Sequence, residues 1–94
     1  MFAHTARVRA RPGKVDLLSE RMREFARRLK VESGCISAYV LVDRESRELL
    51  GVSLWEDREA FLRSTRSAGV PATPTPVESL RESPPEMNTY EVLS

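Results

Sequence analysis

The stretch Gly51-Val-Ser-Leu-Trp-Glu-Asp-Arg-Glu-Ala-Phe61 decides the fold, because its backbone period changes within a few residues. Side chains alternate as in a β-strand up to Trp55, which is the only tryptophan of the chain. Asp57 is then a typical helix N-cap, and Phe61 supplies an apolar contact one turn later. The stretch therefore predicts a strand-to-helix junction, with a large amphipathic ring facing the space between a sheet and a helix.

The segment before this junction predicts a strand and then a helix. Residues 2–11 alternate, and Pro12 with Gly13 ends the strand. From Val15 the apolar residues recur with a helical period, and Gly34 is a suitable terminator. One face of the strand carries small or apolar residues together with the only histidine of the chain: His4, Ala6, Val8 and Ala10.

A hairpin and a second helix surround the junction itself. Residues 35–42 and 49–55 are rich in β-formers, and the polar stretch between them is typical of an exposed loop. The second helix begins after Asp57, and its pattern fades by residues 67–69. This part of the chain therefore predicts two antiparallel strands followed by a short helix.

The rest of the chain completes a βαββαβ order. Residues 70–76 carry three prolines and predict irregular structure, whereas residues 76–82 predict a short helical piece with proline at its first position. Residues 87–93 predict the last strand. With right-handed crossovers in one sheet, this order is the ferredoxin-like α+β arrangement: an antiparallel four-stranded sheet with both helices on one face.

The other face of that sheet carries Leu50, Val52 and Leu54, which is not a solvent-facing set. A chain of 94 residues has nothing left to cover them, and an exposed patch of this kind usually marks an interface. We therefore expect a homodimer that packs sheet against sheet. A monomer with these residues exposed is the alternative.

Length and composition indicate one domain, residues 1–94, of an ordinary globular kind. A formal net charge of +1 gives no argument for nucleic acid as a partner. The chain has no apolar run long enough to span a bilayer and no signal-peptide pattern, so we expect a cytoplasmic protein without a membrane partner. One cysteine and one histidine exclude an internal disulfide framework and argue against a bound metal.

Four segments carry a family resemblance in order and spacing: Ala6-Arg-Val-Arg-Ala-Arg-Pro-Gly-Lys14, Glu32-Ser-Gly-Cys-Ile-Ser-Ala-Tyr39, Leu54-Trp-Glu-Asp-Arg-Glu-Ala-Phe61 and Thr89-Tyr-Glu-Val-Leu93. They resemble the antibiotic biosynthesis monooxygenase (ABM) family over nearly the whole chain. The resemblance implies a dimeric α+β barrel. Members of the family include cofactor-independent oxygenases of aromatic polyketides, quinol oxygenases, haem-degrading enzymes and proteins of unknown activity. The resemblance therefore implies the fold and the dimer more firmly than the chemistry.

Departures from the family pattern narrow what the resemblance implies. In the haem-degrading members the position of Ala6 is an asparagine, and the second helix supplies a histidine to iron. Here residues 61–68 contain no histidine, which counts against haem degradation, although Trp55 matches a tryptophan that those members place in their pocket. Between Ser67 and Pro84 a proline-rich run replaces the family's usual continuation of the second helix.

Trp55 and His4 are the leading candidates for a site. Trp55 could stack on a planar substrate and donate its indole N–H to a carbonyl or an oxygen intermediate, or it could be a half-buried ring that caps the core. His4, on the helix-covered face, could take a proton from a phenol, because an unperturbed histidine titrates near neutral pH. A partly exposed histidine at the start of a strand, without a carboxylate partner, is the alternative.

Further candidates have weaker support. Phe61 would form an apolar wall, and Tyr39 and Asn88, both in predicted strands, would donate hydrogen bonds to a quinone-like substrate. Core residues with satisfied polar groups are the alternative. Arg66 could neutralise an anionic intermediate or be a solvated residue near the helix end. Cys35 has no activating neighbour in the sequence, as is typical of a small buried strand residue.

These observations favour an ABM-like, cofactor-independent monooxygenase that acts on a small planar aromatic or quinol substrate. His4 would act as the base, with neither a cofactor nor a metal. Two alternatives remain open: a non-catalytic dimeric domain of the same fold that binds a small ligand or has a structural role, and an isomerase or lyase that needs only an acid–base pair. A cavity beside Trp55 would favour the enzyme over the non-catalytic domain.

Overall fold

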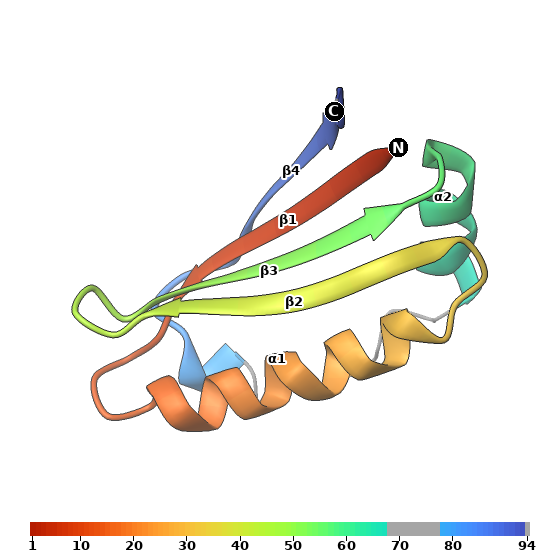
Figure 1. Ribbon diagram of the computed structural model, residues 1–94. Helices are drawn as coiled ribbons and strands as arrows, with labels where there is room; N and C mark the ends of the chain where they lie inside the picture. The colour runs from red at the N-terminus through yellow and green to blue at the C-terminus, as the bar shows by residue number, and fades with distance from the viewer. Residues whose placement is uncertain (68–77, 94) are drawn as a thin grey trace.

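The computed structural model describes residues 1–67 and 78–93 of the chain. Over these residues it has the predicted βαββαβ order, with a short 3₁₀ helix, η1, before the last strand (Figure 1). The fold is the ferredoxin-like α+β arrangement expected from the sequence. Its elements are β1 (Phe2–Arg9), α1 (Val15–Lys30), β2 (Cys35–Asp43), β3 (Glu48–Trp55), α2 (Arg58–Ser67), η1 (Glu78–Leu80) and β4 (Glu86–Glu91).

The strands of the described residues form one antiparallel sheet in the order β2-β3-β1-β4. β1 therefore lies in the interior of the sheet, with its first residues beside the end of β3. In this register Phe2 is opposite Trp55 and His4 is opposite Ser53. Because side chains alternate between the faces of a strand, these four residues share one face of the sheet.

Both helices cover the face that carries His4 (Figure 1). Met22 of α1 contacts β3 at Gly51, where a Cβ would lie 3.4 Å from the Met22 methyl. Phe61 of α2 stacks on His4 itself. The apolar stripe that predicts α1 therefore packs against the sheet. Among the described residues, no helix is both long and apolar enough to cross a membrane.

The main core lies between α1 and the sheet and is closed at one end by η1. Leu18 of α1 and Leu49 of β3 are fully buried, and Leu80 of η1 packs with them. η1 corresponds to the middle of the helical piece expected for residues 76–82. The expectation of irregular structure for the proline-rich run falls within residues 68–77, which lie outside the described residues.

Arg47 fastens the β2–β3 hairpin to the end of β1 and to the segment after η1. Its guanidinium donates to the Ala10 carbonyl at 2.7 Å and to a Glu82 carboxylate oxygen at 2.9 Å. The Ala10 N–H donates in return to the Arg47 carbonyl at 2.9 Å. One part-buried side chain thus ties together three segments that are distant in the sequence.

The turn before β2 packs directly against the start of α2. The Asp57 side chain caps α2 by accepting the Ala60 N–H at 2.9 Å, as the sequence predicts. The Glu56 N–H donates to the Gly34 carbonyl at 2.9 Å. Gly34 has a φ of +88°, and a Cβ at this position would overlap the Ala60 Cβ. Glycine is therefore required here both for the backbone angle and for the close approach of α2.

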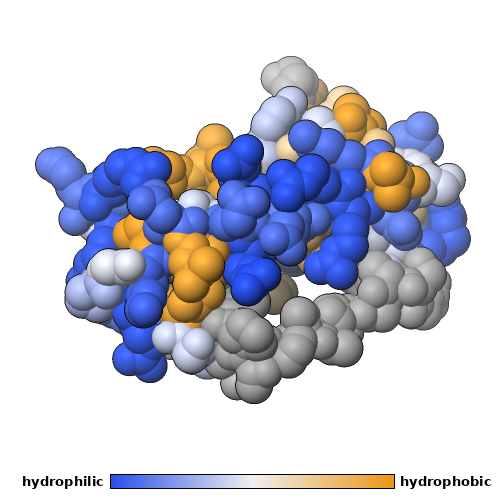
Figure 2. Space-filling model, turned by 90° about the horizontal axis from the view of Figure 1, so that it is seen from below, coloured by the Kyte–Doolittle hydropathy of each residue, from blue (hydrophilic) through white to orange (hydrophobic). Residues whose placement is uncertain are grey.

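The face opposite the helices carries exposed apolar and aromatic side chains. Leu50, Val52 and Leu54 of β3 lie on it, as the sequence predicts. Tyr39 and Leu41 of β2 flank them, and each is 54% exposed. The α1 side of the molecule is different, because hydrophilic side chains cover much of it and hydrophobic ones are scattered between them (Figure 2). The outer face of the sheet thus carries neighbouring apolar side chains on β2 and β3.

Candidate functional site

Four aromatic rings meet at the strand-to-helix junction. Phe61 of α2 is at their centre: its ring centroid lies 4.7 Å from that of His4, 5.5 Å from that of Phe2 and 5.8 Å from that of Trp55. The rings of His4 and Phe61 are stacked with 26° between their planes, whereas Trp55 meets Phe61 edge-on. The structure thus brings together three candidates from the sequence, His4, Trp55 and Phe61, and adds Phe2.

Trp55 forms the inner wall of this cluster and is fully buried, with 0% of its surface exposed. Its indole N–H donates to the Ser53 hydroxyl at 2.9 Å inside the core. The ring therefore offers neither a free donor nor exposed surface to a ligand in this structure. Its ring meets Phe61 edge-on from the core side. Direct contact between Trp55 and a substrate stays a prediction.

His4 is partly exposed at the edge of the cluster. Burial lowers the pKa of its imidazole below the ordinary value of 6.5. The ring is therefore neutral near neutral pH, and one of its nitrogens can accept a proton. Within residues 1–67 and 78–93 the imidazole has no hydrogen-bonding partner and no ion pair, so that nitrogen is not committed to another group there.

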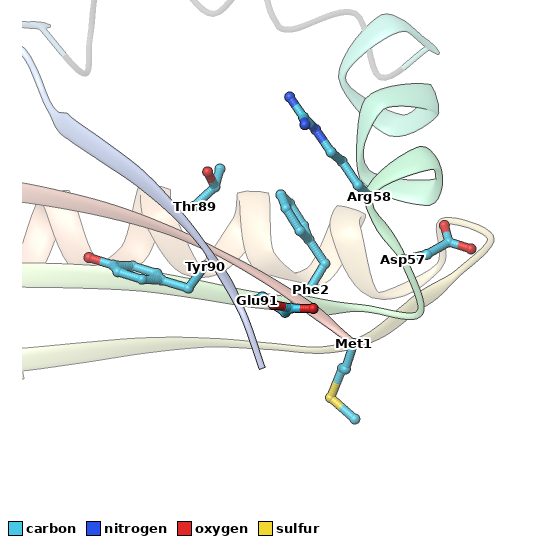
Figure 3. Close-up of a pocket in the computed structure, with 7 residues that line it drawn as sticks. All are labelled: Met1, Phe2, Asp57, Arg58, Thr89, Tyr90 and Glu91. Carbon is cyan, nitrogen blue, oxygen red and sulfur yellow. The ribbon is translucent and has the colours of Figure 1, made fainter. Parts of the chain in front are cut away.

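A hollow of about 450 Å³ opens beside the cluster, between the start of β1, the end of β4 and the start of α2 (Figure 3). Phe2 belongs to both the hollow and the cluster. Thr89 lies opposite His4 in the β1–β4 register, and Glu91 lies opposite Phe2, so both are on the helix-covered face. The hollow therefore lies next to the strand position of His4 through Thr89, although His4 itself does not line it. The lining residues are Met1, Phe2, Asp57, Arg58, Thr89, Tyr90 and Glu91.

Tyr39 and Asn88 lie on the opposite face of the sheet from this cluster. Tyr39 is paired with Val52 and Asn88 with Thr5, and these positions alternate with the helix-facing ones. The structure therefore does not bring either residue together with His4. A pocket between the sheet and the helices of one chain cannot use them as hydrogen-bond donors.

The remaining candidates do not join the cluster. The Cys35 thiol donates to the Ser37 carbonyl, with 3.6 Å between sulfur and oxygen, and burial raises the pKa of this thiol. It is thus held as a thiol, which fits a structural strand residue better than a nucleophile. The side chain of Arg66 lies outside the described residues. Nor do the described His, Cys, Asp and Glu side chains gather into a group of three that could hold a metal ion.

The amino-acid sequence matches one family model, described as antibiotic biosynthesis monooxygenase, over residues 1–73. The chain belongs to the ABM family. No match was found among curated proteins. Membership confirms the family resemblance, and three of its four segments lie within the matched residues. It also agrees with the observed order of helices and strands.

Solved structures are similar to this ABM-family chain over nearly its whole length. Rv0793 from Mycobacterium tuberculosis has a TM-score of 0.80 at 21% identity, with 99% of this chain and 95% of that chain covered. PA3566 from Pseudomonas aeruginosa has a TM-score of 0.80 at 20% identity, with 99% and 94% covered. A Deinococcus radiodurans protein named for the same family reaches 0.84 at 18% identity, with 100% and 94% covered. At such identities these likenesses show the fold alone.

The second helix of this ABM-family chain has no histidine that could bind haem iron. The only histidine of the sequence is His4, on β1, whereas the resemblance to haem-degrading members would require a histidine on α2. α2 spans Arg58–Ser67 and contains none. The cluster at the junction therefore lacks the iron ligand that this branch of the family uses.

Arg58 and Thr89 line the hollow of this ABM-family chain, although neither is among the candidates expected from the sequence. The place of Thr89 depends on the register of β4 against β1, which no local pattern reveals. Arg58 does have a local signal, because it is the first residue of α2, where the helix dipole disfavours a cation. The neighbours Asp57 and Glu59 are of the charge that the dipole favours, so helix stability does not account for the arginine.

Proposed function

We propose that this ABM-family protein is a cofactor-independent monooxygenase that oxidises a small planar phenol or quinol. The observation that carries the proposal is His4, a neutral imidazole at the edge of an aromatic cluster whose Phe2 ring also lines a hollow of about 450 Å³. A partly exposed base among aromatic rings suits proton removal from a phenol. Family membership supports the reaction class without naming a substrate.

In the proposed reaction the neutral imidazole of His4 accepts the phenolic proton of the substrate. The resulting anion is electron-rich at the ring carbon that reacts, and it passes electrons directly to molecular oxygen. For a substrate with a reactive methylene group, loss of two hydrogens and gain of one oxygen atom gives a ketone. The second oxygen atom leaves with the two hydrogens as water, so the reaction balances without an added reductant.

The aromatic residues around His4 have distinct roles in this proposal. Phe61 stacks on one face of the imidazole, which fixes the orientation of the ring and keeps water from that face. Phe2 is shared between the cluster and the hollow, so it offers its ring to the substrate. Trp55 holds Phe61 in place from the core and does not itself need to touch the substrate.

Oxygen uptake by the purified protein tests the proposal. A panel of anthrones and hydroquinones should include at least one substrate that the protein oxidises with uptake of one oxygen molecule per turnover. His4→Ala should lower that rate by about 10²-fold or more, because it removes the general base. Thr5→Ala, on the same strand but on the opposite face, is the matched control and should leave the rate unchanged. No uptake with any member of the panel, or an unchanged rate in His4→Ala, would remove the proposal.

A non-catalytic ligand-binding domain is the second candidate, and the burial of Trp55 favours it. The ring that the sequence singles out most strongly is a core residue with a satisfied N–H, so the junction does not need a ligand to explain it. Binding of an aromatic compound without oxygen uptake, unaffected by His4→Ala, would favour this candidate over the enzyme.

We also propose that the chain forms a homodimer through the outer face of its sheet. Tyr39, Leu41 and Tyr90 are all more than half exposed there. An exposed apolar patch on a sheet usually marks an interface, and the family resemblance implies the same dimer. Sedimentation at micromolar concentration tests it, since a stable monomer would contradict the sheet-to-sheet arrangement.

A further inference from the structure

Arg58 is a cation at the hollow that the fold itself does not use. Its side chain is exposed, and within the part of the chain that the structure describes its guanidinium has neither an ion pair nor a hydrogen bond. It is the first residue of α2, where the helix dipole disfavours a positive charge. The capping of α2 is performed by Asp57, whose carboxylate accepts the Ala60 N–H. Arg58 therefore has no role in stabilising the helix, and its guanidinium is available to a ligand.

Three elements present complementary groups to the same side of the sheet at this point. Figure 3 shows Arg58 from α2, Phe2 from β1 and Thr89 from β4 projecting to that side, whereas Asp57 points away from Phe2. All of these residues line the hollow. The hollow thus combines a free cation, an aromatic ring and a hydroxyl with the carboxylates of Asp57 and Glu91. This is a small set of polar groups around an apolar surface, which is typical of a site for a small molecule.

We propose that the hollow selects a planar aromatic compound that carries one carboxylate. The carboxylate would bind the guanidinium of Arg58, the ring would lie against Phe2, and the Thr89 hydroxyl would hydrogen-bond to a polar substituent. A guanidinium matches a carboxylate with two parallel hydrogen bonds, so it recognises this group better than a neutral one. The inference rests on the proposed function in that it names the substrate class of the same site, an aromatic acid with a phenolic group.

Glu91 fixes the direction in which such a compound binds. It lies opposite Phe2 in the β1–β4 register, and Figure 3 shows its carboxylate on the other side of Phe2 from the Arg58 guanidinium. The negative charge repels a second anionic group and attracts a hydrogen-bond donor. The carboxylate of the ligand is therefore directed toward Arg58. Removal of the Glu91 charge should strengthen the binding of an anion.

Three naphthalene derivatives of matched size test the proposal: naphthoate, naphthol and naphthylmethylammonium, which are anionic, neutral and cationic. Binding is followed by amide chemical-shift titration of the full chain, with the shifts of β4 and the start of α2 as the readout. The wild-type protein should bind naphthoate about fivefold more tightly than naphthol, as one exposed charge pair allows. The cationic compound should bind more weakly than naphthoate.

Four variants separate the role of Arg58 from a general charge effect. Arg58→Gln should remove the preference for naphthoate, and Arg58→Lys should keep part of it. Arg63→Gln is the matched control, because Arg63 is an exposed arginine of the same helix that does not line the hollow. It should leave the preference unchanged. Glu91→Gln should tighten naphthoate binding by about twofold, since it removes a like charge.

Two results would overturn the proposal. One is equal affinity of the wild-type protein for naphthoate and naphthol, and the other is an equal loss of preference in Arg58→Gln and Arg63→Gln. Neither result depends on turnover. If naphthoate selectivity is observed while no phenol or quinol is oxidised, the monooxygenase proposal fails and the binding proposal stands. If oxidation is observed without any preference for anions, the monooxygenase proposal stands and the carboxylate-binding proposal fails.

Discussion

Replacing Gly34 by alanine should destabilise the protein much more than the same change at Gly13. Both glycines have a left-handed φ, +88° at Gly34 and +78° at Gly13. A Cβ at Gly13 would meet nothing within 4 Å, whereas one at Gly34 would overlap the Ala60 Cβ at the start of α2. Gly13→Ala therefore carries backbone strain alone, and Gly34→Ala carries backbone strain together with a steric overlap.

The two contributions differ enough to be measured. A left-handed φ costs an alanine about 1–2 kcal/mol, and about 0.4–1 kcal/mol of this is offset because alanine restricts the unfolded chain. Gly13→Ala should thus lower the free energy of unfolding by about 1 kcal/mol. Forced overlap in a packed region adds about 1–3 kcal/mol, so Gly34→Ala should lower it by about 2–4 kcal/mol. In a domain of this size each kcal/mol corresponds to about 4–8 °C in melting temperature.

Urea unfolding followed by far-ultraviolet circular dichroism measures these changes. All variants should be compared at one protein concentration, because dimerisation would make the stability concentration-dependent. Ala60→Gly alone should cost about 1 kcal/mol in helix propensity. It also removes the overlapping methyl group, so the double variant with Gly34→Ala should be about 1–3 kcal/mol more stable than additivity predicts. Equal costs at Gly13 and Gly34, or strict additivity, would refute the close approach of Ala60 to Gly34.

Three further predictions concern other parts of the molecule. Arg47→Ala should lower the free energy of unfolding by about 1–3 kcal/mol, because it removes two hydrogen bonds of a part-buried guanidinium. Replacement of the exposed Arg44 by alanine is the control and should change it by less than about 1 kcal/mol in the same urea titration. Burial lowers the folded pKa of His4 below its unfolded value of 6.5. Between these two pKa values the unfolded state binds more protons than the folded state, so thermal stability should fall as the pH drops below 6.5. An equal fall in His4→Asn would show that the imidazole is not responsible. Leu41→Asp, on the outer sheet face, should convert a homodimer to a monomer in sedimentation velocity, whereas Leu17→Asp, on the exposed side of α1, should not.

The order of the elements could be predicted because its signals are local. The helical period from Val15, the cap at Asp57 and the terminator at Gly34 each act within a turn or two of the chain. The helical period and the cap are found where the pattern places them. α1 ends already at Lys30 with Val31 as its C-cap, so Gly34 lies in the turn before β2 and does not terminate the helix. The last strand shows the limit of this approach, since residues 87–93 are predicted and Glu86–Glu91 is observed. The end of an edge strand depends on its partner, and β4 loses its partner where β1 begins.

The faces and the exposure of the candidate residues depend on non-local pairing. The face on which Tyr39 lies is set by the β2–β3 register, which is irregular between Cys35 and Ser37. A slip of one residue would turn Tyr39 toward the helices, so residue type alone does not decide its role. The burial of Trp55 likewise depends on where α2 places Phe61, and no pattern within β3 contains that information.

The position of α2 connects the fold to both proposed activities of the site. α2 carries Phe61 against His4, and it carries Arg58 over the hollow. Its start is held by the turn at Gly34, so a side chain there would displace the helix as well as destabilise the fold. Gly34→Ala should therefore weaken naphthoate binding under conditions in which circular dichroism shows the variant to be folded, whereas Gly13→Ala should bind as the wild-type protein does. Equal binding by the two variants would show that the junction does not control the geometry of the hollow, and the structural link between the two would be lost.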